Sequence, residues 1–156
     1  MRHLTSALLL GTALLVPGAA LAKDISVDVQ LVRYSGNPAY LAVYVTNPDG
    51  SYNSTLWVSG TRTRWLRDLR QWAEGASAAG VTLDGITGAS VGGGQVLTVN
   101  ASIADSLIDA GYEVHVDSAV EHGGSYSSDA VVPLTSAQNG LAVAGTGYVS
   151  QMSVSF

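Results

Sequence analysis

Apolar and polar residues alternate along much of the chain with a period of two, the spacing of a half-buried β-strand. Such alternation predicts strands over residues 25–31 and 39–46. In the second, Tyr40, Ala42 and Tyr44 would share one face, and the intervening Leu and Val residues the other. Shorter strands are predicted over 55–58, 112–117, 130–134 and 148–156.

Turn-forming residues separate these segments, for example Asn37-Pro38 and the run Asn47-Pro48-Asp49-Gly50. Several short strands divided by Gly, Asn and Ser turns are typical of two packed antiparallel sheets. We therefore expect a mainly β protein, an immunoglobulin-like β-sandwich with one short helix.

The helix is expected over residues 64–73, where apolar residues recur at helical spacing, and Gly75 is a plausible end. The expected buried stripe is Leu66, Leu69 and Ala73, with Trp65 and Trp72 at its flanks. On this helix Arg67 and Arg70 would be surface neighbours.

The strand over 112–117 would turn Val114 and Val116 inward and Glu113, His115 and Asp117 outward. An outward row of this kind is either a solvated strand face or a divalent-metal site. His115 and His122 are the candidate ligands, but two histidines near carboxylates are a weak signal, and we predict no resident metal.

The N-terminus has the pattern of a secretory signal peptide. A basic start at Arg2 and His3 precedes an apolar run over 8–16 and the small-residue sequence Ala20-Leu21-Ala22. We expect cleavage after Ala22, export to a bacterial periplasm, and one β-sandwich domain over 23–156. No later apolar run reaches membrane length, so we do not expect a membrane-embedded protein.

Composition narrows the choice of chemistry. The chain has 7 basic and 12 acidic residues and no cysteine. An acidic protein is a poor match for nucleic acid, and without thiols it forms neither disulfides nor thiolate metal sites. The basic residues are unevenly placed, because Arg62, Arg64, Arg67 and Arg70 lie together.

The segment Asp84-Gly85-Ile86-Thr87-Gly88-Ala89-Ser90 fits the pattern Asp-x-x-Ser/Thr-Gly-Ala-Ser/Thr. It resembles the acceptor signature of proteins that carry FMN covalently, such as the FMN subunits of sodium-pumping quinone reductases. The resemblance implies that the Ser90 hydroxyl is the attachment point. Asp84, Thr87, Gly88 and Ala89 would then form the motif that an FMN transferase recognises.

The chemistry requires an exposed acceptor with little bulk beside it. Gly88 and Ala89 are small, and Gly-rich stretches over 75–80 and 92–94 bracket the motif, so we expect Ser90 to be accessible. The alternative is an ordinary loop in which Thr87-Gly88 makes a turn capped by Asp84.

Arg67 and Arg70 are candidates to stabilise the phosphodiester, because guanidinium groups pair well with phosphate. The alternative is a solvated helix face, on which arginines contribute little. Trp65 and Trp72 could stack on an isoalloxazine ring. Packing in the core is the better interpretation of these two tryptophans.

Three spaced elements also resemble the predicted periplasmic proteins of domain-of-unknown-function family 2271. These elements are Trp57-Val58 with the run 62–69, the motif 84–90, and the run 121–126. The resemblance implies that the protein works together with membrane reductases of the PepSY type and with an FMN transferase. Residues 96–100 depart from it, because members commonly have a longer Trp-Asp-Gly turn there.

The sequence therefore favours a periplasmic, flavinylated electron-transfer protein with covalent FMN on Ser90. It would be a redox carrier and a transferase substrate rather than an enzyme, and its partner would be a membrane-bound reductase. The alternative is a cofactor-free immunoglobulin-like module with a binding or structural role.

Overall fold

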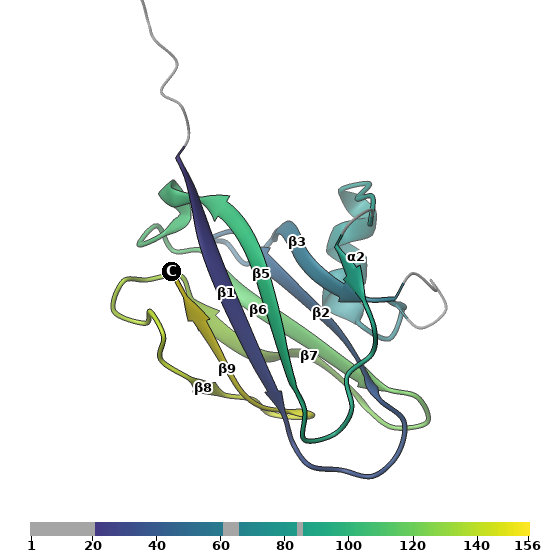
Figure 1. The fold of residues 1–156 in the computed structure, drawn as a ribbon. Coiled ribbons are helices and arrows are strands. Elements are labelled where there is room, and N and C mark those ends of the chain that lie inside the picture. The colour runs from purple at the N-terminus through teal and green to yellow at the C-terminus, as the bar shows by residue number, and fades with distance from the viewer. Residues whose placement is uncertain (1–20, 61–65, 84–85) are drawn as a thin grey trace, which may run out of the picture.

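Two β-sheets stack face to face in the computed structural model, which describes residues 21–60, 66–83 and 86–156 (Figure 1). The four-stranded sheet has the order β5-β1-β9-β8, and the five-stranded sheet the order β4-β3-β2-β6-β7. This arrangement confirms the expected mainly β sandwich. The strands are β1 (Ala22–Leu31), β2 (Ala39–Thr46), β3 (Tyr52–Ser59), β4 (Thr87–Gly88), β5 (Val96–Ala104), β6 (Glu113–Val120), β7 (Ser125–Pro133), β8 (Val143–Ala144) and β9 (Val149–Ser155).

The main core lies between the sheets and is apolar. The alternation in β1 buries Ile25, Val27, Val29 and Leu31, as the period of two predicts. Antiparallel pairing joins β1 to β5 and to β9. β1 starts at Ala22, so the expected cleavage would leave an exported chain that begins one residue inside this strand.

A second apolar cluster lies on the other face of the five-stranded sheet. Ala42 and Tyr44 of β2 and Val58 of β3 meet Leu69 and Trp72 there. Helix α2 (Arg70–Ala78) covers this face, as Figure 1 shows beside β3. The two faces of β2 separate as the sequence predicts, and both are buried because β2 is the central strand.

The predicted helix 64–73 agrees only in part with the structure: Arg64 and Trp65 lie outside the described residues, Leu66 is helical, and α2 begins at Arg70. Leu66 and Leu69 are buried as expected, but both precede α2, and Trp72 is buried in place of Ala73. The helix does not end at Gly75, which is needed for close packing instead. A Cβ there would lie 2.3 Å from the Tyr52 Cβ, so only glycine lets the helix approach β3 this closely.

Several strands differ from the sequence-based expectation, and the short β4 and β8 were not predicted. β5 was not predicted, yet it pairs with β1 along its whole length and buries Val99 and Ile103. β7 begins at Ser125 rather than at residue 130. Within the described ranges no helix is both long and apolar enough to cross a bilayer.

Candidate functional site

Ser90 lies on a short segment that is tied down at both ends. Before it, β4 runs parallel to β3, and the Gly60 N–H donates to the Gly88 carbonyl oxygen over 2.6 Å. After it, Val91 and Ala39 exchange both backbone hydrogen bonds, at 2.7 and 2.9 Å. The segment runs from β4 toward the turn that precedes β5 (Figure 1). Ser90 is thus held beside the sheet.

Ser90 and Ala89 are both exposed and lie outside any strand. Within the described residues the Ser90 hydroxyl has no hydrogen-bond partner. Its neighbour Val91 is buried in the inter-sheet core together with Ala39. The exposure of Ser90 agrees with the expected accessibility.

Gly88 has a structural role of its own. A Cβ at this position would lie 2.7 Å from Cζ2 of the Trp57 indole. Thr87 and Gly88 are extended and pair with Val58 and Ser59, so the alternative interpretation of these two residues as a turn is wrong. The proposed cap, Asp84, lies outside the described residues.

The glycines that follow the motif form a fixed turn. The Gly92 N–H donates to Oε1 of Gln95 over 2.9 Å, and the Gly94 N–H donates to the Val32 carbonyl oxygen over 2.8 Å. A Cβ at Gly93 would lie 2.5 Å from the carbonyl oxygen of Tyr34. The Ser90 segment therefore ends in a well-packed turn, whereas the sequence indicated only an open, glycine-rich one.

Arg67 and Arg70 are exposed on the α2 side of the sheet. They are not the helix neighbours that we expected, because α2 starts at Arg70 and Arg67 precedes it. Neither forms an ion pair with another described residue. Both guanidinium groups are therefore available to an anion, while Arg62 and Arg64 lie outside the described residues.

The face of β6 that was expected to be solvated is covered by α2. Asp117 is fully buried and His115 is 7% exposed. Oδ1 of Asp117 accepts hydrogen bonds from the Tyr44 hydroxyl and the Ser128 N–H, and Oδ2 accepts one from the Trp72 N–H. Asp117 thus caps the first turn of α2 from the sheet, since Leu69 at the N-cap position provides no side-chain cap.

Burial shifts the acidity of the tyrosine in this network. Desolvation first, and the Asp117 charge second, raise the pKa of Tyr44 far above its ordinary value. The phenol therefore stays protonated and donates to the carboxylate. The network joins β2, β6, β7 and α2 around one buried charge.

The two histidines do not share a site. Nδ1 of His115 is 2.8 Å from Oγ of Ser128, and its Nε2 is 3.1 Å from Oε2 of Glu113. His122 is 3.7 Å from Glu121 in the β6–β7 turn, beyond the other end of β6. No cluster of three or more metal-ligating side chains occurs among the described residues.

A second buried carboxylate was not found by sequence reasoning. Asp129 is 1% exposed, and its oxygens accept the N–H groups of Thr146, Gly147 and Val149 and the Ser118 hydroxyl. These bonds fasten β7 to the turn between β8 and β9. With every oxygen engaged inside the fold, Asp129 is structural.

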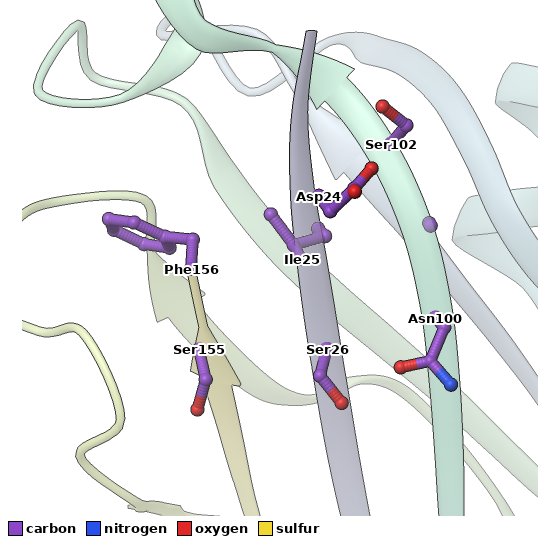
Figure 2. Close-up of a pocket in the computed structure, with 8 residues that line it drawn as sticks. Asp24, Ile25, Ser26, Asn100, Ser102, Ser155 and Phe156 are labelled. Atoms are coloured by element: carbon purple, nitrogen blue, oxygen red, sulfur yellow. The ribbon is translucent and has the colours of Figure 1, made fainter.

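A shallow depression on the outer face of the four-stranded sheet carries small polar side chains. Figure 2 shows Asp24, Ser26, Asn100, Ser102 and Ser155 side by side on β1, β5 and β9. Asp24 is the one ionisable side chain lining it. The other side chains of its lining are uncharged, and none is a histidine.

Comparison with protein families gives a match over residues 22–151 to the family described as predicted periplasmic protein (DUF2271). The same comparisons find no match among the curated proteins and none among the solved structures. The matched range spans the whole sandwich from β1 to the start of β9, including the Ser90 segment. This chain therefore belongs to the DUF2271 family of predicted periplasmic proteins.

Proposed function

We propose that this protein is a periplasmic electron carrier with FMN esterified to Ser90. The observation that supports the proposal is the state of this residue, an exposed hydroxyl without a hydrogen-bond partner among the described residues, on a segment anchored on both sides. An acceptor must reach into another protein's active site and yet keep a defined position, and this segment meets both needs.

The attachment reaction is a phosphoryl-type transfer from FAD. The Ser90 oxygen would attack the phosphorus on the FMN side, forming one P–O bond while the anhydride bond to AMP breaks. AMP departs with the electron pair of that bond, and the hydroxyl proton passes to a base of the transferase. No oxidation or reduction occurs, so this chain needs only to present its hydroxyl.

A phosphodiester on Ser90 would need a cationic partner, and Arg67 and Arg70 are the candidates. The ester would carry one negative charge, and Arg67 and Arg70 are exposed cations without ion-pair partners among the described residues. Ala89 adds little bulk beside the acceptor, and Gly88 is held in place against Trp57. The bound flavin would supply reversible electron transfer, with a membrane-bound reductase as the expected partner and no turnover by this chain alone.

A test uses the exported protein co-expressed with an FMN transferase. We expect flavin absorbance to remain with the polypeptide after denaturation and gel filtration, and to be absent from Ser90→Ala. Ser127→Ala, which removes another exposed hydroxyl, should keep it. Equal flavin content in Ser90→Ala and the parent would exclude Ser90 as the acceptor.

A cofactor-free module is the second candidate, and one observation favours it. The close contact with Trp57 explains why a glycine occupies position 88, and recognition by a transferase is not needed to explain it. A glycine needed for packing therefore accounts for one motif position, and a colourless protein beside an active transferase would support this role.

A further inference from the structure

A cleft of about 340 Å³ lies between β3 and β5 at one edge of the sandwich. Residues 98–102 of β5 and 55–57 of β3 form its walls, and Ile86 of the motif completes its lining. β5 is the outermost strand of the four-stranded sheet (Figure 1). The cleft therefore lies at a sheet edge and borders the motif that carries Ser90.

We propose that this cleft holds the isoalloxazine ring of the FMN carried by Ser90. The inference rests on the proposed function, and it adds where the redox-active ring lies and which groups contact it.

Ser90 and the cleft are close because the motif itself forms part of the wall. Ile86 lines the cleft, and Gly88 lies against the cleft residue Trp57, since an added Cβ would be 2.7 Å from Cζ2 of the indole. Ser90 follows Gly88 by two residues, so their Cα atoms are at most about 7 Å apart. The phosphate and ribityl chain of FMN can span this distance. A flavin esterified to Ser90 can therefore place its ring in the cleft.

Trp57 on the β3 wall has the chemistry to contact the ring. It pairs with Val43, a residue of the inter-sheet core, and its side chain packs against the same core. The side chain is half-buried, and its Nε1–H has no acceptor among the described residues. The indole face favours stacking with a flat heterocycle, and the free N–H can donate to a flavin oxygen.

The β5 wall supplies space and hydrogen-bonding groups. Ala101 is partly buried against the inter-sheet core, and its small side chain leaves room for a planar group. Because β5 ends its sheet, the backbone N–H and C=O groups along its outer side have no strand partner within the described sheets. The pyrimidine edge of a flavin carries C=O acceptors on either side of an N–H donor, which is a pattern that such a strand edge can match.

The ring position can be tested by flavin fluorescence on the exported protein, with attachment verified by mass. An indole in contact with a flavin quenches its fluorescence by donating an electron to the excited ring, which phenylalanine does not do. We expect the flavin to be about 5-fold less fluorescent on the folded parent than on the denatured protein, as the stability of a stacked aromatic pair predicts. Trp57→Phe should remove most of this quenching. Trp72→Phe makes the same change on the other face of the five-stranded sheet and should leave the quenching unchanged.

Ala101→Leu provides a second readout that retains the indole. The larger side chain would fill the cleft and displace the ring, so flavin fluorescence should rise toward that of the denatured protein. Ala104→Leu makes the same change on β5 outside the cleft lining and should match the parent.

The outcomes separate the cleft assignment from the proposed function. If the attached flavin is as fluorescent on the folded parent as on the denatured protein, the cleft assignment is overturned while attachment to Ser90 stands. The same holds if Trp57→Phe and Ala101→Leu are quenched as strongly as the parent. If the parent acquires no FMN beside an active transferase, the proposed function itself fails and the assignment fails with it.

Discussion

The two faces of the five-stranded sheet are built on different principles. The face toward β1, β5 and β9 packs aliphatic side chains against one another. The face under α2 combines apolar residues with a buried carboxylate, Asp117, that binds the helix, β2 and β7 at once. The first face defines the sandwich, and the second fixes the position of the helix.

This difference has an energetic consequence. Apolar contacts tolerate small shifts, whereas hydrogen bonds to a buried charge require a defined geometry. The position of α2, and with it that of Arg70 at its start, should therefore depend on a few polar residues. The inter-sheet core should be insensitive to those residues.

Asp117→Ala should have the largest effect and should separate the two faces. It leaves the Tyr44 hydroxyl and the Trp72 and Ser128 N–H groups without their acceptor, so we expect a loss of about 4 kcal/mol in the free energy of unfolding. Denaturant unfolding measures the loss. Hydrogen exchange should show faster exchange in α2 and little change in β1.

Asp49→Ala is the matched control, because this carboxylate is exposed and bonds only to Ser51 in a turn. We expect it to cost less than about 1 kcal/mol. Equal losses for Asp117→Ala and Asp49→Ala would contradict the role assigned to the buried charge.

Gly75→Ala should have the next largest effect, because it tests the approach of α2 to β3. The added methyl group would overlap the Tyr52 side chain, and we expect about 2 kcal/mol of destabilisation from overpacking. Alanine otherwise favours a helix over glycine, so a stabilised variant would show that the helix lies farther from the sheet. Thermal unfolding of the variant and the parent decides between these outcomes.

Alkaline pH should act on the covered face, and over the first pH unit above about 10 its effect should stay below that of Gly75→Ala. Because the pKa of Tyr44 is raised in the folded state, its contribution to stability is complete below about pH 10 and declines above it, as the unfolded phenol ionises first. The expected slope is about 1.4 kcal/mol per pH unit for this group. Tyr44→Phe should remove that part of the slope between pH 10 and 12, and an unchanged slope would count against the buried phenol.

Much of the sandwich was predictable because strand periodicity is local. The alternation in β1 and β2 separated the two faces of each strand correctly. The same signal exists in β5, where Leu97, Val99, Ala101 and Ile103 alternate with polar residues. The small Ala101 and the exposed Val96 weaken it, and no strand was predicted there.

The covered face could not be predicted in the same way. A polar residue such as Asp117 gives the same alternating pattern whether water or a helix covers its face of the strand. The helix that covers this face comes from residues 70–78, which are distant from β6 in the sequence. The start of α2 was misplaced for the same reason, since its cap is a carboxylate on β6 rather than a residue beside it. Gly75 was predicted to end the helix because the local sequence does not reveal that it packs against Tyr52, which is distant in the chain.

The candidate site was partly predictable. Small residues around Ser90 indicated an accessible segment, and the residue is exposed. The anchoring of this segment was not apparent, because it depends on backbone pairing of Val91 with Ala39 and of Gly88 with Gly60. Arg67 and Arg70 are exposed as expected, but they do not lie on one helix.

The most direct test of the account is the intact mass of the exported protein after co-expression with an FMN transferase. We predict an increase of one FMN moiety less one water, and peptide mapping that places it on the fragment containing Ser90. A transferase that modifies another acceptor but leaves this folded chain at its unmodified mass would contradict the account.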